Sequence, residues 1–431
     1  MQALLSFDKA PPFAAPLRFF LTAPIFLALA AGVMLYAGED GLGSRWAPAT
    51  LAMTHLVTIG FMLQVMLGAL IQILPVVAGA NLPHPLALSR GVHLGLSVGC
   101  LLLAAGFLLA MPELLVLATL LLGVAVSGFL LAGLLALWAV PSTSPTIRGL
   151  KLSLVGLAGL LGLGGLLALA MAWGWSLPLP ALTDLHVGWA LGAWGGVLLA
   201  SVAYVVVPMF QLTPGYPARP SWWLPVGILT ALVGWAACLW VELDAGVRLA
   251  QAALAMQGMA FALQTLKLQS LRRRAKVDVT YRYWQLGLVC AIVALGMLLC
   301  VAIVPAWADA PEWTLIFGIL LLGGGFIPFI AGMLFKILPF LAWLHLQNEG
   351  QGKVPAPPMN KLLPETWGLW QYRLHVLACL VLLAAVFAPA QLARPAACCC
   401  LLASLSLAGC LFAGTRRYQR QRRQILEAMQ A

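Results

Sequence analysis

The sequence predicts an all-α polytopic membrane protein of about twelve transmembrane helices, and three observations support this fold class. Of the 431 residues, 62% are hydrophobic and only 9% are Asp, Glu, Lys or Arg, whereas a soluble domain carries roughly 25% charged residues. Apolar runs of about 20 residues recur along the chain, each long enough to cross a hydrocarbon core of roughly 30 Å. Strand-like alternation is absent, so backbone groups in lipid must pair within helices.

The predicted spans follow one another along the whole chain and leave no stretch that reads as a soluble module. We therefore expect a single membrane domain over residues 1–431 that ends in a basic tail at 416–431. The longest connection, at 346–369, is rich in proline and is expected to be a surface linker. The twelve spans are predicted at residues 17–37, 50–77, 89–110, 113–139, 150–174, 182–211, 221–241, 245–271, 281–305, 312–344, 370–389 and 394–415.

The charged residues separate according to the parity of the connecting loops, which predicts the orientation of the chain. The positive-inside rule assigns the basic side to the cytoplasm, so both termini are expected there, in a bacterial inner membrane. The net charge of +11 then reflects topology and contact with the anionic lipid bilayer, and no nucleic-acid partner is expected. The opposite side holds Glu39, Asp40, Glu113, Asp184, Glu242, Asp244, Asp309 and Glu312, with only Arg45, Arg248 and Arg394.

Spans 2 and 10 echo each other in sequence, and span 6 carries a weaker copy. The matching segments read GALIQILPVVA, GMLFKILPFLA and SVAYVVVPMFQ, and their prolines are Pro75, Pro339 and Pro208. In chain order these prolines are 133 and 131 residues apart, and each lies near the cytoplasmic end of a span that runs inward. Chance similarity between Gly- and Pro-containing membrane helices is the alternative explanation.

The spacing predicts an architecture, because internal repeats of membrane proteins are units of the fold. One proline-bearing span in every four indicates a four-helix unit repeated three times around a pseudo-threefold axis normal to the membrane. Most transporters of twelve spans divide instead into two halves of six. The three repeats are expected at about residues 17–139, 150–271 and 281–415.

Twelve spans, three four-helix repeats and polar residues in spans 2, 6 and 10 together resemble subunit I of the haem–copper oxidases. The segments THLVTIGFMLQVMLGALIQILPVVAG and GMLFKILPFLAWLHL, and the opening PLRFFLTAP, resemble oxidase-like membrane proteins related to the NnrS family. The resemblance covers essentially the whole chain. It implies haem b, and copper as a further option, between helices toward the outer face, with His55 at the span 2 position that supplies a low-spin haem ligand.

The chain departs from the oxidases at the positions that define their catalytic centre. Oxidases carry two histidines on span 10, a histidine near a tyrosine on span 6 and a His-His pair on span 7. Here spans 7 and 10 have no histidine within lipid. We therefore expect an oxidase-like scaffold without terminal-oxidase activity.

Two of the six histidines are candidate ligands. His55 precedes Pro75 by 20 residues and His186 precedes Pro208 by 22, so their depths differ by about 3 Å. Two imidazoles at similar depth can bind one haem iron from both sides. They can also hold copper, with Met53 as a soft third ligand. Hydrogen bonding between helices is the alternative for both rings, and the two-residue offset argues against strict equivalence.

The other four histidines, His84, His93, His345 and His375, are predicted to lie in loops or near the cytoplasmic ends of spans. Beside His186, the glycines at 188, 192 and 196 form a stripe. We assign Gly188, Gly192 and Trp189 to the cofactor pocket, although tight helix packing is the commoner meaning of such a stripe.

Two polar residues in the spans support a different function for the protein. Gln72 and Lys336 occupy equivalent repeat positions, three residues before Pro75 and Pro339, and a charged residue in a span indicates a functional site by default. Lys336 can also reach the headgroups by snorkelling. The sequence therefore leaves three functions open, the third being an assembly or stress-response membrane protein with no small-molecule site. The preferred one is a haem-binding membrane protein for electron transfer with an unidentified redox partner, for haem or metal handling, or for response to nitric oxide. The alternative is a cofactor-free transporter or channel with Gln72 and Lys336 at its inner mouth.

Overall fold

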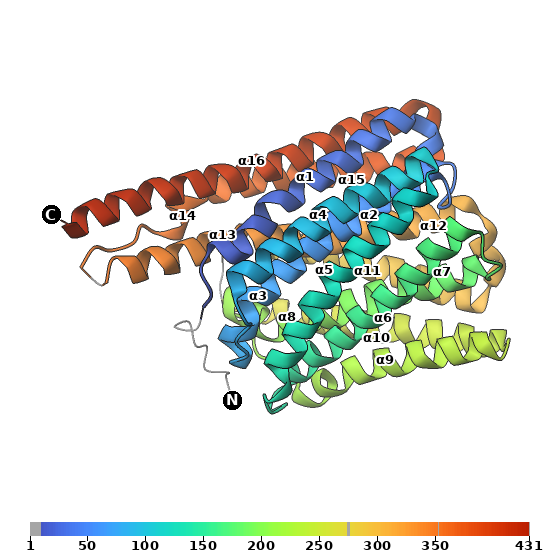
Figure 1. The fold of residues 1–431 in the computed structure, drawn as a ribbon, viewed down its shortest axis with the longest axis horizontal. Coiled ribbons are helices and arrows are strands. Elements are labelled where there is room, and N and C mark those ends of the chain that lie inside the picture. The colour runs from blue at the N-terminus through green and yellow to red at the C-terminus, as the bar shows by residue number, and fades with distance from the viewer. Residues whose placement is uncertain (1–9, 274–275, 352, 431) are drawn as a thin grey trace.

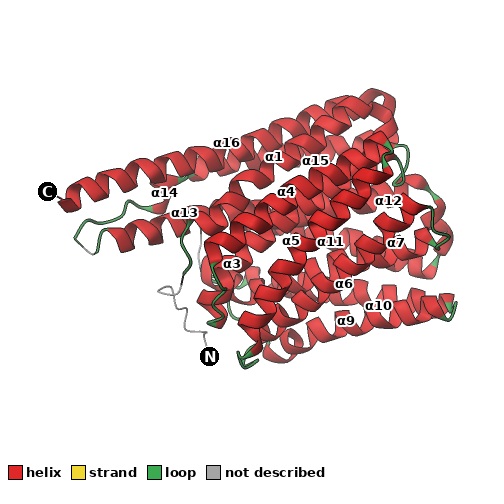
Figure 2. Ribbon diagram, viewed as in Figure 1, coloured by secondary structure: helices red, strands yellow, loops and turns green. Residues whose placement is uncertain are grey.

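The computed structural model describes residues 10–273, 276–351 and 353–430. All regular structure in these ranges is helical (Figures 1 and 2). Eleven helical rods are long and apolar enough to cross a membrane. A further long helix, α10, packs between α9 and α11. Its Gln and Lys residues make it less apolar than the other eleven. The chain is therefore a multi-pass helical membrane protein with eleven or twelve spans.

Nine of the spans are continuous helices. Connections are short, so each helix runs antiparallel to its neighbour in the chain (Figure 1). These helices are α1 (Ala14–Ala37), α4 (Pro85–Leu109), α5 (Pro112–Trp138), α6 (Pro145–Trp173), α9 (Ala218–Trp240), α10 (Asp244–Ser270), α11 (Val279–Ile303), α15 (Glu365–Phe387) and α16 (Pro389–Gln430).

The remaining three spans, numbers 2, 6 and 10, are each interrupted by a π-helical segment of eight residues. Span 2 consists of α2 (Pro48–His55), η3 (Leu56–Leu63) and α3 (Gln64–Ala78). Span 6 consists of α7 (Leu179–Gly188), η4 (Trp189–Gly196) and α8 (Val197–Gln211). Span 10 consists of α12 (Pro311–Gly318), η6 (Ile319–Phe326) and α13 (Ile327–Glu349). The short elements η2 (Gly38–Leu42), η5 (Pro305–Asp309) and α14 (Met359–Leu362) lie in connections.

Local sequence explains where many helices begin and end. Proline opens α4, α5 and α6, because the first turn needs no backbone N–H and φ is already helical. Ser144 accepts a hydrogen bond from the backbone N–H of Ile147 at the start of α6, which is a standard N-cap. Gly79 and Gly174 adopt φ of +67° and terminate α3 and α6, a backbone conformation that glycine adopts without strain.

The three interrupted spans are more buried than most of the continuous ones. Among the most apolar 18 residues of each span, the buried fraction is 78% for span 2 and 56% for span 6, against 22% for α9 and α11. Span 10 reaches 50%, as does α1. Spans 2, 6 and 10 therefore form much of the interior of the bundle, while helices such as α9 and α11 are largely left facing outward.

Two ends of the bundle are distinguished by charge. We call the end that holds the α1–α2, α6–α7, α9–α10 and α11–α12 connections the acidic end, and the opposite end the basic end. Beyond the basic end, α13 and α16 continue side by side (Figure 1), joined by a salt bridge of 2.8 Å between Arg422 and Glu349. The segment 416–430 is thus a helical extension of α16, and the predicted linker at 346–369 is shorter than expected because α13 runs to Glu349.

Candidate functional site

A cavity of about 1060 Å³ lies between the three π-helical segments. Residues of η3, η4 and η6 all contribute to its walls, together with residues of α4, α6, α9, α10, α11 and α15. Most of the lining side chains are Leu, Ile, Val, Met, Phe, Ala and Gly. This volume is at the upper end of the range for ligand pockets, roughly 300–1,000 Å³. The interior of the bundle therefore has room for a large, mainly apolar molecule.

His55 is the last residue of α2 and lines this cavity. Its Nδ1 lies 2.8 Å from the carbonyl oxygen of Leu51, one turn earlier in the helix. A carbonyl can only accept a hydrogen bond, so Nδ1 carries the proton and Nε2 of the neutral ring keeps a free electron pair. The ring also packs against Phe107, with 5.2 Å between ring centroids. This arrangement fixes both the tautomer and the direction of the imidazole, as second-shell hydrogen bonds do for metal-ligating histidines.

His186 lines the same cavity from α7, three residues before η4. Its Nδ1 is buried and has no hydrogen-bond partner among the described residues. The ring lies against α6 at Gly164, where an added methyl group would come within 3.1 Å of Cε1. An unpaired polar atom in a buried ring costs roughly 1–3 kcal/mol, and each such group requires an explanation.

The two imidazoles are at matched depth and face a common space. Each is the seventh residue after the first residue of its helix, Pro48 in α2 and Leu179 in α7, which places both about 10 Å from the acidic end. The structure thus places both histidines that the sequence singled out on the wall of one cavity, despite the offset in their distances from the prolines.

The residues near His186 in span 6 have two roles: some line the cavity, and some pack against adjacent helices. Gly188 and Gly192 both line the cavity. An added methyl at Gly188 would also lie 2.9 Å from Leu232 and from Trp235 of α9, so close packing is part of this glycine's role. Trp189 faces α6, where it lies against Gly159, and it does not line the cavity, whereas Trp194 of the same π-helical segment does.

Met53 lines the cavity near its acidic end, with its terminal methyl close to Gly41. Among the described residues, no group of three or more His, Cys, Asp or Glu side chains is arranged to hold a metal ion. The cavity lining holds three histidines, two cysteines and five methionines, but the His, Cys, Asp and Glu side chains among the described residues are not gathered into such a group. This dispersed set suits a bare copper ion poorly, because such an ion needs the protein to supply most of its ligands.

His375 is a cavity residue that the sequence did not identify, and its predicted position near the cytoplasmic end of span 11 is wrong. It is the eleventh residue of α15, only 7% exposed, and it lines the cavity. Its Nε2 donates a hydrogen bond of 2.9 Å to the carbonyl oxygen of Gly323 in η6. The nearby Arg373 lies on the exposed side of α15, over the Trp370 ring.

The other three histidines lie away from the cavity. His93 lies 2.9 Å from the Thr22 hydroxyl oxygen, and His345 lies 2.9 Å from the Tyr418 hydroxyl oxygen on the extension of α16. His84 occupies a left-handed position before α4, with φ of +42°. None of the three lines the cavity.

The mouth of the cavity at the acidic end carries an ion pair. Arg45, in the α1–α2 connection, lies 2.5 Å from a carboxylate oxygen of Asp184 in α7, and its guanidinium stacks over Trp46 at 4.8 Å. Arg45 and Asp184 both line the cavity. This contact joins two segments 139 residues apart in the chain.

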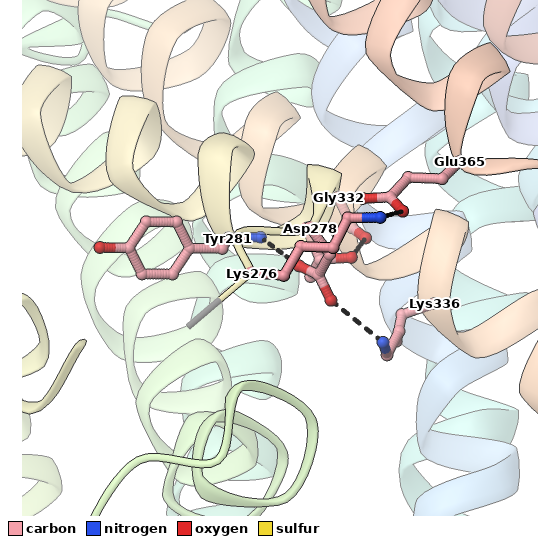
Figure 3. Close-up of polar contacts among 7 residues, drawn as sticks. Lys276, Asp278, Tyr281, Gly332, Lys336 and Glu365 are labelled. Carbon is pink, nitrogen blue, oxygen red and sulfur yellow. Dashed lines mark hydrogen bonds and ion pairs between the residues drawn. The ribbon is translucent and has the colours of Figure 1, made fainter. Parts of the chain in front are cut away.

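Gln72 and Lys336 do not meet in a shared pore. Gln72 lines a separate chamber of about 70 Å³ between α3, α8 and α13, whose other walls are mostly apolar. Lys336 instead forms an ion pair of 3.1 Å with Asp278, at the start of α11 (Figure 3). In the same view, Asp278 accepts a hydrogen bond from the backbone N–H of Tyr281, and Lys276 reaches Glu365 at 3.8 Å.

No known protein family matches the chain, and no curated protein is significantly similar to it. The chemistry of the cavity must therefore be inferred from the residues that line it.

Proposed function

We propose that this protein binds haem b in the cavity between spans 2, 6 and 10, with His55 as one axial ligand and His186 as the other, and that it serves in electron transfer. The observation that carries the proposal is the pair of imidazoles at one depth on one large apolar cavity. His55 has its tautomer set by Leu51 and keeps Nε2 free. His186 has a buried nitrogen that no described group of the protein satisfies.

Haem suits this donor set better than a bare metal ion does. The porphyrin supplies four nitrogens of its own, so the protein has to add only one or two axial ligands. A bare copper ion at Met53, His55 and His186 would have only two imidazoles and one thioether as protein ligands, so haem is the preferred occupant. The apolar walls also match a porphyrin, which is a flat and largely apolar molecule.

Ligation on both sides favours electron transfer over gas binding. Bound haem b supplies an iron that changes its oxidation state by one electron. Two axial histidines leave no open position on that iron, whereas a sensor of nitric oxide or another diatomic gas needs one. Binding by His55 alone, with His186 as a neighbouring group, would instead support the gas-response role.

We further propose that the chain is built from three four-helix repeats, as in subunit I of the haem–copper oxidases. The support is structural as well as sequential. The three π-helical segments begin 133 and 130 residues apart, close to the spacing of the prolines, and end 12, 12 and 13 residues before Pro75, Pro208 and Pro339. π-helical segments are rare and are frequent at functional sites, so three at matched positions favour duplication over chance.

The transport alternative finds less support along the proposed solute path. A path along the bundle axis has to pass between α3, α8 and α13, where the chamber beside Gln72 has about 70 Å³ and walls that are mainly Val, Ile, Leu and Phe. Lys336 is held aside by Asp278. A cofactor-free transporter would therefore need these helices to separate.

Absorption spectra of the purified full-length protein test the haem proposal. We expect a Soret band and, after reduction, the narrow visible bands of a six-coordinate haem, with one haem per chain. His55→Ala should lower the haem content at least about tenfold, and His186→Ala should leave a haem with an open position that binds carbon monoxide.

His84→Ala is the matched control, since His84 lies outside the cavity, and it should keep the wild-type spectrum. A colourless wild-type preparation from cells that load a control cytochrome with haem would contradict the proposal and favour the transporter. Haem retained in both His55→Ala and His186→Ala would exclude these residues as its ligands.

A further inference from the structure

Arg45 has a special position among the residues that line the cavity. No other Lys or Arg is among the described residues of its walls, and Arg45 lies at the acidic end, the same end from which His55 and His186 are about 10 Å deep. The remaining charged residues of the lining are the carboxylates Asp184 and Asp309. The cavity therefore offers a bound molecule one cation, at its mouth, and apolar walls elsewhere.

This asymmetry bears on how a haem would be oriented. Haem b carries two propionate carboxylates on one edge of an otherwise apolar plane. A carboxylate pushed into apolar walls loses its hydration without compensation, at a high cost in free energy. The propionate edge must therefore face the mouth at the acidic end, where a guanidinium can bind a carboxylate through two parallel hydrogen bonds.

The present partner of Arg45 can be exchanged. Asp184 holds the guanidinium at 2.5 Å, but the side chain of Asp184 is 41% exposed and that of Arg45 is 33% exposed. An ion pair with this much solvent exposure contributes little net stability. Asp184 can turn to water at small cost, which leaves Arg45 free to bind another carboxylate while it stays stacked on Trp46.

We propose that Arg45 binds a haem propionate and thereby orients the haem, and that Asp184 competes for the same guanidinium and holds it when haem is absent. This inference rests on the proposed haem-binding function. It assigns Arg45 a positioning role at the cavity mouth and makes Asp184 an internal competitor of the ligand rather than part of its binding site.

Opposite effects of the two partners test this role. The readout is the rate at which haem leaves the detergent-purified holoprotein for an excess of apomyoglobin. Arg45→Gln should accelerate haem loss about tenfold or more, as expected for removal of a hydrogen bond to a charged group. Arg45→Lys should fall between, because lysine keeps the charge but loses the paired donors. Asp184→Asn should leave haem loss unchanged or make it slower, since the competitor is gone.

A merely structural ion pair would behave differently, because Arg45→Gln and Asp184→Asn would then accelerate haem loss alike, and that result would overturn the inference. Arg248→Gln, at the same end but outside the cavity lining, is the matched control and should not change the rate. Equal rates in Arg45→Gln and Arg248→Gln would also overturn the inference. Failure of the haem proposal itself is recognised separately, by a wild-type protein without a Soret band.

Discussion

At the scale of single residues, Asp278 combines two roles that substitutions can separate. Its side chain pairs with Lys336 at 3.1 Å and accepts the hydrogen bond from Tyr281 N–H that caps α11. Both charged side chains are mostly buried, at 12% and 22% exposure, so loss of the pair should cost about 1–2 kcal/mol of stability. Asparagine caps a helix as well as aspartate does, whereas alanine does not.

We therefore expect both Lys336→Met and Asp278→Asn to destabilise the protein, and Asp278→Ala to cost about 1 kcal/mol more than Asp278→Asn through loss of the cap. Thermal unfolding in detergent, followed with a thiol-reactive dye that reports the nine free cysteines, provides the comparison. Equal melting temperatures for Asp278→Asn and Asp278→Ala would show that the cap contributes nothing measurable.

Some residues of the candidate site could be predicted from the sequence, and others could not. His55 and His186 could be selected from the sequence because each lies on a proline-bearing span at a definite distance from its proline. His375 could not, because it enters the cavity from a neighbouring helix, α15, and only the packing of that helix on η6 directs it to Gly323. Arg45 was likewise visible only as an exception in an acidic loop.

At the scale of elements, hydropathy predicted where the helices begin and end better than it predicted their internal geometry. The ninth span was predicted at 281–305 and α11 covers Val279–Ile303. Hydropathy marks only the part of a helix that lies in lipid, so it does not predict the extension of α16 to Gln430. In span 10, the glycines at 323–325 and Pro328 indicate an irregular middle. The sequence does not predict the π-helical segments of spans 2 and 6, since such a shift of backbone hydrogen bonds depends on tertiary packing.

The packing of α6 on η4 predicts opposite effects on stability for two glycine substitutions in α6. A methyl group on Gly156 would overlap the backbone carbonyl of Ala193, which cannot move aside as a flexible side chain would. Gly162, on the same helix, has no atom within 4 Å of that position. Gly156→Ala should therefore destabilise the protein by roughly 1–3 kcal/mol through overpacking, whereas Gly162→Ala should be neutral or stabilise it by up to about 1 kcal/mol through helix propensity.

The melting temperatures of these two variants measure the difference directly. Because Trp194 of η4 lines the cavity, Gly156→Ala should also reduce haem retention, and Gly162→Ala should not. If both variants melt at the wild-type temperature, α6 and η4 are packed less closely than the structure indicates.

At the scale of the whole molecule, the charges of the loops and the direction of the cavity are connected. Among the Lys and Arg residues that the structure describes, only Arg45, Arg248 and Arg394 lie toward the acidic end, where the mouth of the cavity carries Arg45 and Asp184. If the basic end faces the cytoplasm, as the positive-inside rule requires, the cavity opens toward the outer face. A redox partner outside the cytoplasm would then be closer to the cavity than a partner on the cytoplasmic side.

Single cysteines at the two ends test this orientation. Ala306 in η5 and Thr143 in the α5–α6 connection are both exposed, and they lie at the acidic and basic ends respectively. In intact spheroplasts, a membrane-impermeant maleimide should label Ala306→Cys, while Thr143→Cys should react only after the membrane is permeabilised. The unsubstituted chain sets the background, because its exposed Cys398 lies about 13 Å along α16 from the acidic end, within the lipid-crossing part. Labelling of Thr143→Cys alone in intact spheroplasts would invert the topology and place the cavity mouth, with any electron donor, in the cytoplasm.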